Sequence, residues 1–116
     1  MPGVTSSRHL TPRTTRSGLV VALTAADSAT TIQVPVGASA VSLAFYDPLG
    51  NLVRGRVGFS VEGTTPTLTD GDDTLGYQGR ETVTYYLSSW CVFLHVAAPD
   101  ASPTTTITVR GTWWYD

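Results

Sequence analysis

Apolar and polar residues alternate with a period of two along most of the chain, the pattern of strands that bury one face. The apolar sets on this spacing are Ile32, Val34 and Val36; Val41, Leu43 and Phe45; Val53, Val57, Phe59 and Val61, opposite Arg54, Arg56 and Ser60; and Val83, Tyr85 and Leu87. The stretch GLVVAL, residues 18–23, alternates more weakly. No stretch has a helical period, so we expect strands throughout.

Two later segments carry large aromatic residues. In WCVFLHVA, residues 90–97, both alternating sets are largely apolar, which predicts a strand covered on both faces, with Trp90 in the core and Cys91 as a buried thiol. In the final segment, TTTITVRGTWWYD, the apolar set includes Trp113 and predicts a core position for it. Trp114 then falls on the polar face.

Clusters of turn-forming residues separate these runs, namely ADSA, PVGAS, DPLGN and PDASP. Residues 47–51, DPLGN, are predicted to connect a hairpin. Seven or eight short strands without a helix predict one all-β domain over residues 19–116, an antiparallel β-sandwich or jelly roll.

Residues 62–80, EGTTPTLTDGDDTLGYQGR, interrupt the rhythm of the strands. A connection this long is usually functional or disordered, so we expect an interaction loop. Its candidate binding residues are Asp70, Asp72, Asp73 and Tyr77. The three carboxylates offer oxygens that suit Ca²⁺, but their spacing does not match an EF-hand, so a solvated turn is favoured and no metal or cofactor is expected.

Charge is divided unevenly along the chain. Residues 1–18 hold Arg8, Arg13 and Arg16 and no acid, a net charge of +3, whereas residues 19–116 hold four arginines and nine carboxylates, a net charge of −5. The first segment has no periodicity and contains two prolines, so we expect an extended basic arm that does not fold alone. Its arginines suit carboxylates of a neighbouring subunit. Nucleic acid is not favoured, because three charges bind it weakly and the acidic body opposes it.

No targeting or membrane segment is expected. The apolar stretch GLVVALTAA is short for a secretion signal and lacks a clear cleavage site. No stretch approaches the ~18 apolar residues of a membrane-spanning helix. A single cysteine cannot form a disulfide within the chain. We therefore expect synthesis in the cytoplasm and no membrane partner.

No catalytic arrangement is evident. Cys91 and His95 share a strand face but lie four residues apart, about 13 Å at ~3.3 Å per residue, which is too far for proton transfer. Glu62 and Glu81 flank the long loop, and nothing apolar nearby suggests a raised pKa for either carboxyl. The chain lacks a phosphate-binding loop, zinc-ligand spacing and a nucleophile elbow. We expect a protein that is not an enzyme.

Aromatic residues on polar faces indicate a contact surface. Tyr86 and Trp114 both fall on polar faces, and Tyr and Trp are enriched at interfaces because they bury a large area at small entropic cost. With the arginines of the arm they form the predicted interface set: Arg8, Arg13, Arg16, Tyr86 and Trp114.

A basic arm, a threonine-rich β-sandwich without lysine, one long loop and an aromatic final strand together resemble the small virion structural proteins of tailed bacteriophages, most of all capsid decoration or cement proteins. The resemblance is architectural, covers the whole chain and rests on no single motif. It implies a subunit of the virion that binds the major capsid protein or other virion subunits through its arm, as a homo-oligomer with a trimer favoured.

Two alternatives remain open. A tail, neck or small coat subunit of a virion would have the same features. A carbohydrate-binding or adhesin-like module would stack sugar rings on Trp114, Tyr86 and Tyr77, but such sites usually add amide groups, and this chain has only Gln33, Gln78 and Asn51.

Overall fold

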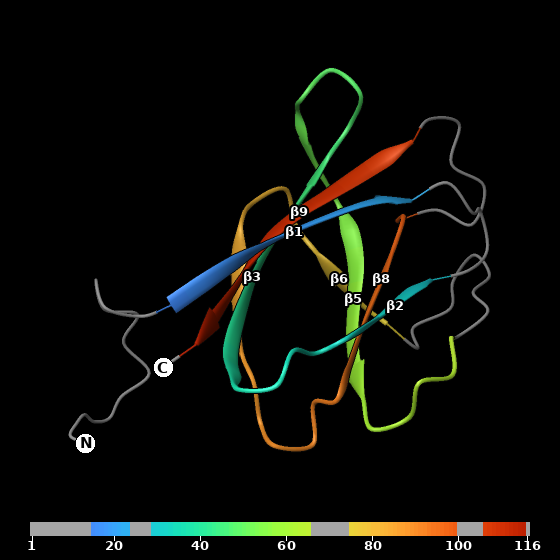
Figure 1. Cartoon of the computed structure of the whole chain (residues 1–116). Helices are drawn as coiled ribbons and strands as arrows, with labels where there is room; N and C mark the ends of the chain where they lie inside the picture. The colour runs from blue at the N-terminus through green and yellow to red at the C-terminus, as the bar shows by residue number, and fades with distance from the viewer. Residues whose placement is uncertain (1–14, 24–28, 66–74, 100–105, 116) are drawn as a thin grey trace.

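The protein is a sandwich of two antiparallel sheets (Figure 1). The computed structural model describes residues 15–23, 29–65, 75–99 and 106–115. Within these residues there are nine strands, one more than the upper expected number, and no helix. Their bounds are β1 Thr15–Leu23, β2 Thr30–Gln33, β3 Ala38–Tyr46, β4 Leu52–Val53, β5 Gly55–Ser60, β6 Gly76–Gln78, β7 Val83–Tyr86, β8 Phe93–Ala97 and β9 Ile107–Tyr115. The predicted all-β sandwich is confirmed.

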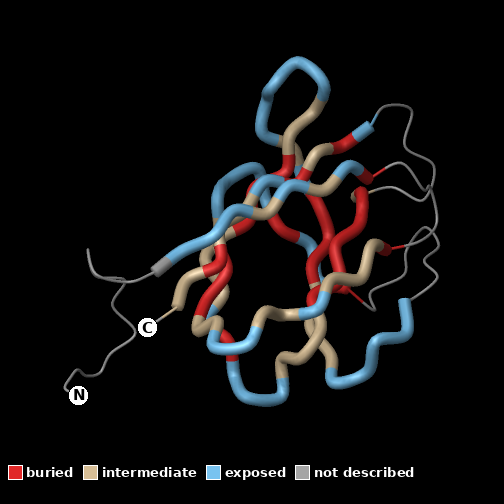
Figure 2. The backbone as a smooth tube through the Cα atoms, viewed as in Figure 1, coloured by how far each residue is buried: buried red, intermediate tan, exposed pale blue. Residues whose placement is uncertain are grey.

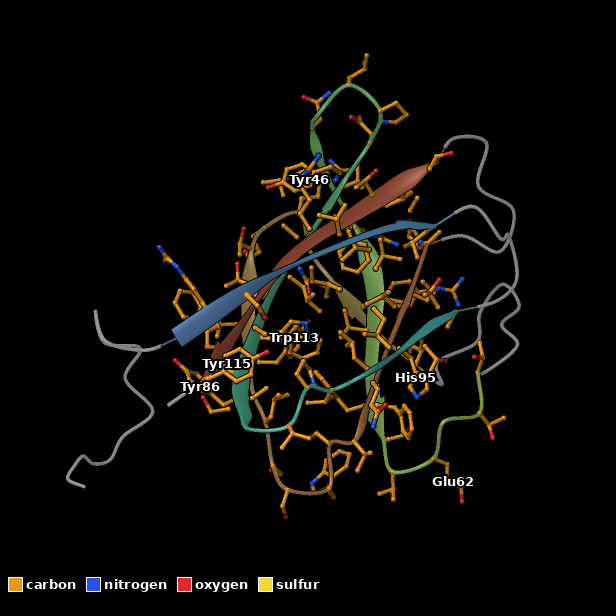
Figure 3. All side chains as sticks on the ribbon, viewed as in Figure 1. Tyr46, Glu62, Tyr86, His95, Trp113 and Tyr115 are labelled. Carbon is orange, nitrogen blue, oxygen red and sulfur yellow. The ribbon has the colours of Figure 1, made fainter. Side chains whose placement is uncertain are left out.

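The first sheet has five strands in the order β1-β9-β3-β4, and β7 pairs with β3 as well. Val41, Leu43 and Phe45 alternate along β3 and are fully buried, and Trp113 on β9 lies directly opposite Val41. Trp113 is therefore in the core, as its apolar face predicted. In Figure 3 its ring points toward the space between the two sheets.

The second sheet has the order β2-β8-β5-β6. Leu94 and Val96 on β8 and Val57 on β5 face the first sheet and complete one core. Figure 2 shows buried positions along strands of both sheets. The prediction that β8 is covered on both faces holds from Leu94 to Ala97, where every residue is buried.

The segment read as one strand over residues 52–61 divides between the two sheets. It pairs with β3 as β4, passes through Arg54, and continues as β5 in the second sheet. Gly55 occupies this crossing because a Cβ there would collide with the ring of Phe45. The alternation of apolar residues continues through the crossing, so the pattern did not reveal the break.

The hairpin predicted at residues 47–51 joins β3 to β4. The amides of Leu49 and Asn51 both donate to Oδ1 of Asp47, each at 2.9 Å. Gly50 has a φ of 85°, a conformation that glycine adopts without strain. The bond from the Asn51 amide is the main reason that the pKa of Asp47 lies below its usual value. The hairpin projects from the body of the sandwich (Figure 1).

Several expected boundaries were wrong. Trp90 is not in the core but 54% exposed, because a turn from Ser88 to Cys91 precedes β8. Cys91 is partly buried against the core rather than enclosed in a strand. Val36 and Val61 are exposed, because β2 and β5 end at Gln33 and Ser60.

The arm and the long loop also begin and end differently from the expectation. β1 starts at Thr15, so residues 15–18 belong to the sheet rather than to the arm. Within the expected loop of residues 62–80, Gly76–Gln78 form β6 and pair with β5. Tyr77 is therefore a strand residue.

Candidate functional site

Three residues of the predicted interface set lie in one row on the outer face of the five-stranded sheet. The register pairs Arg16 on β1 with Trp114 on β9, Trp114 with Ala40 on β3, and Ala40 with Tyr86 on β7. Directly opposed residues of neighbouring strands share a face, so these four side chains form a row across the sheet. We call it the Arg16–Tyr86 row.

Trp114 is held within this row by its own chain. Its indole N–H donates to Oγ of Ser42 at 2.9 Å, and the guanidinium carbon of Arg16 lies 5.7 Å from its ring centroid. The Ser42 hydroxyl also contacts Oγ1 of Thr84 at 2.8 Å. These contacts explain how Trp114 is accommodated on a polar face. The polar edge of its indole is hydrogen-bonded to the sheet, and its ring is half-buried.

Tyr86 forms one end of the row and, like Arg16 at the other end, is exposed. Its side chain is 51% exposed, whereas Ala40, between Tyr86 and Trp114, is fully buried. Figure 3 shows Tyr86 at the same end of the molecule as Tyr115, whose hydroxyl lies 3.0 Å from Oγ of Ser17. The row therefore presents one cation and two aromatic rings on paired strands.

The remaining predicted residues are placed elsewhere or lie outside the described residues. Arg8 and Arg13 of the interface set, and Asp70, Asp72 and Asp73 of the loop, fall outside them. Tyr77, 52% exposed, stands on β6 of the other sheet. The structure thus brings Arg16, Tyr86 and Trp114 together and separates Tyr77 from them.

Tyr77 has two arginine neighbours. The guanidinium carbons of Arg54 and Arg56 lie 5.3 and 5.5 Å from its ring centroid. Arg56 is only 1% exposed; its Nε–H donates to the carbonyl oxygen of Ala98 at 2.9 Å, and its Nη1 has no hydrogen-bond acceptor among the described residues. The alternating pattern placed Arg56 on a polar face and missed this burial.

A second polar cluster, also missed from the sequence, surrounds His95 on the outer face of the four-stranded sheet. Nε2 of His95 lies 2.6 Å from Oγ of Ser60, and Nδ1 lies 2.9 Å from Oγ1 of Thr31. Ser60 donates its hydroxyl hydrogen to the carbonyl oxygen of Glu62, at 2.6 Å. The Ser60 oxygen must therefore accept from His95, so the neutral ring carries its hydrogen on Nε2 and accepts from Thr31.

This geometry stabilises a buried histidine and does not activate a nucleophile. The hydrogen of Ser60 is committed to a backbone carbonyl, and the second nitrogen of His95 faces a hydroxyl rather than a carboxylate. Burial lowers the pKa of His95, which keeps the ring neutral near pH 7. The sequence places Ser60 and His95 35 residues apart, and only the pairing of β5 with β8 brings them together.

A cavity of about 270 Å³ lies beside this cluster. Its lining includes His95, Ser60, Glu62, Thr64 and Leu75. Figure 3 shows Glu62 at the periphery, away from the body of the sandwich. Among the described residues, no group of three or more histidine, cysteine or acidic side chains is placed to hold a metal ion.

Comparison with known proteins gave no relative: no family model, no curated protein and no solved structure matches the chain. In the described part of the chain, no helix is long and apolar enough to cross a membrane.

Proposed function

We propose that this chain is a non-enzymatic structural subunit of a virion, which binds the outer surface of the capsid as a decoration or cement protein. The virion assignment follows from the architectural resemblance of the sequence. The observation that carries the choice of surface is the Arg16–Tyr86 row, which gathers three of the predicted interface residues on one sheet face.

The composition of the row suits a protein partner. Arg, Trp and Tyr are the residues that most often contribute the binding energy of protein interfaces. Trp114 is already fixed by Ser42 and Arg16, so little side-chain freedom remains to be lost on binding. Arg13 precedes Arg16 by only three residues in the sequence, so we expect the arm and the Arg16–Tyr86 row to contact the same partner.

The test is a comparison of two tyrosines with matched exposure. Tyr86 is 51% exposed in the row, and Tyr77 is 52% exposed on the other sheet. Each tyrosine is replaced by alanine in the full chain, and co-sedimentation of each variant with assembled capsids of the virus that encodes the chain is measured. We expect Tyr86→Ala to weaken binding at least about tenfold, equivalent to ~1.4 kcal/mol, and Tyr77→Ala to leave it unchanged.

Other outcomes identify the alternatives. Sedimentation with isolated tails, and not with capsids, would assign the chain to a tail or neck subunit. Loss of binding in Tyr77→Ala alone would move the contact to the other sheet. Binding to a glycan array that either variant abolishes would favour the carbohydrate-binding module, although Tyr77 does not share a face with Tyr86 and Trp114.

A further inference from the structure

The five-stranded sheet ends in a long edge strand. β1 spans nine residues and pairs with β9 along its entire length, from Thr15 to Leu23. Within the described residues it has no neighbour on its other side. The other strands at the sheet borders are shorter, two residues for β4, three for β6, and four each for β2 and β7.

β1 lacks the features with which proteins usually protect an exposed edge. Such edges are short, bulged, or carry proline, lysine or inward-pointing charges. β1 contains no proline and no lysine, its register with β9 has no bulge, and Arg16 is its single charged residue. Every second residue of the strand directs its backbone N–H and C=O away from β9, which leaves a row of hydrogen-bonding groups ready to pair.

We propose that β1 pairs antiparallel with β1 of a second copy of this chain about a two-fold axis, joining two five-stranded sheets into one. This inference does not depend on the proposed function, because it concerns the edge of the sheet and not its outer face. The contact is self-complementary, so one interface covers both free edges and the assembly closes at two copies. A lone strand from another protein, added to β1, would leave its own second edge exposed.

Charge favours the antiparallel arrangement. In a two-fold pair centred on Leu19, Arg16 stands opposite position 22 of the second copy. The two Arg16 residues are then six positions apart, roughly 20 Å at ~3.4 Å per residue. That distance exceeds the screening length of about 8 Å at physiological salt. A parallel pair in register would place the two guanidinium groups on adjacent strands.

Apolar surface is exposed on β1 itself, which favours a partner strand that is apolar at the point of contact. Val20 is 64% exposed on the outer face, directly opposite Arg110 of β9. In the pair centred on Leu19, Val20 of each copy lies diagonally across from Val20 of the other, at about 7–8 Å. Each valine thereby covers part of the apolar surface that the other exposes.

The test places a carboxylate at this contact. In Val20→Glu the new side chain faces Arg110 within its own chain, which is a favourable cross-strand pair, while the two glutamates repel each other across the dimer. Val61→Glu is the control, because Val61 is 60% exposed and lies just beyond β5 in the other sheet. Sedimentation velocity over a range of concentrations gives the dimer dissociation constant of each full-length protein.

We expect a reversible dimer for the wild-type protein and for Val61→Glu, and a dissociation constant at least tenfold higher for Val20→Glu. Hydrogen exchange at the β1 amides is expected to slow with rising protein concentration as the dimer forms. A wild-type monomer at all concentrations, a trimer, or equal effects of the two variants would overturn the proposal. Slow exchange in a purely monomeric sample would overturn it too, because the chain's own residues would then cover the edge.

Discussion

Trp113 and Trp114 are consecutive residues with different environments, and their substitutions should differ accordingly. Trp113 is buried opposite Val41, so Trp113→Ala should lower the free energy of unfolding by about 3–5 kcal/mol. Trp114→Phe keeps a ring over the sheet but removes the hydrogen bond to Ser42, which should cost about 0.5–1.5 kcal/mol. Urea denaturation of both variants measures the difference. Equal losses would mean that β9 is covered on both faces.

His95 makes stability depend on pH in a defined direction. Burial lowers the pKa of its ring in the folded protein, whereas the unfolded chain has the ordinary value near 6.5. Below pH 6.5 the unfolded state therefore binds a proton that the folded state does not, and stability is lost as the pH falls through the folded pKa. Above pH 6.5 the ring is neutral in both states, so its contribution to the free energy of unfolding no longer changes with pH.

The corresponding measurement is the free energy of unfolding between pH 7.5 and pH 5 for the wild-type protein and for His95→Gln. We expect the wild-type decrease over this range to be smaller in the variant. His9 is present in both proteins and cancels in the comparison. Identical pH profiles would show that the His95 ring is not shielded from water in the folded protein.

At the scale of elements, the crossing from β4 to β5 depends on the absence of a side chain at Gly55. In Gly55→Ala the new methyl group meets the ring of Phe45, and overpacking of this kind costs about 1–3 kcal/mol. In a Phe45→Leu background the clash is relieved, so the added cost of Gly55→Ala should be smaller. A double-mutant cycle by chemical denaturation measures this coupling.

Gly79→Ala is the control for this cycle, because a Cβ at Gly79 has no heavy atom within 4 Å. Its effect should stay within about 0.5 kcal/mol of zero. Additive costs of the two substitutions in the cycle would contradict the close packing of Phe45 on Gly55.

The elements that the sequence predicted well are those whose alternation coincides with one sheet. The apolar sets of β3, β7 and β9 each face one core, and the residues 47–51 carry a turn signal of their own. β6 was missed because three residues, Gly-Tyr-Gln, are too short to show a period. The break at Arg54 was missed because a strand that changes sheets keeps its alternation while it changes neighbours.

Side-chain burial was predicted least well where tertiary partners decide it. Arg56 is buried because Tyr77 and the Ala98 carbonyl lie beside it, and neither contact follows from the spacing along β5. Gln78 is buried for a similar reason: its amide nitrogen donates to the carbonyl oxygen of Leu43, and its oxygen accepts from Tyr85. Local patterns carry no information on such distant acceptors.

For the whole molecule, sequence reasoning identified members of the candidate surface but not the surface itself. Arg16, Tyr86 and Trp114 were each singled out, from charge or from an aromatic residue on a polar face. That they form one row follows from the strand order β1-β9-β3 and the pairing of β7 with β3. Strand order is set by the packing of the complete domain, so it could not be read from any single segment.

The position of β9 between β1 and β3 has a consequence for synthesis. The two flanking strands are made early and do not pair with each other, and the strand that joins them is the last of the nine to be translated. Non-local pairing of this kind makes folding slow, and unpaired strands in a nascent chain are prone to aggregation. Until β9 is made, β1 is therefore unpaired along both of its edges, and neighbouring nascent chains on one messenger RNA would meet with that strand exposed.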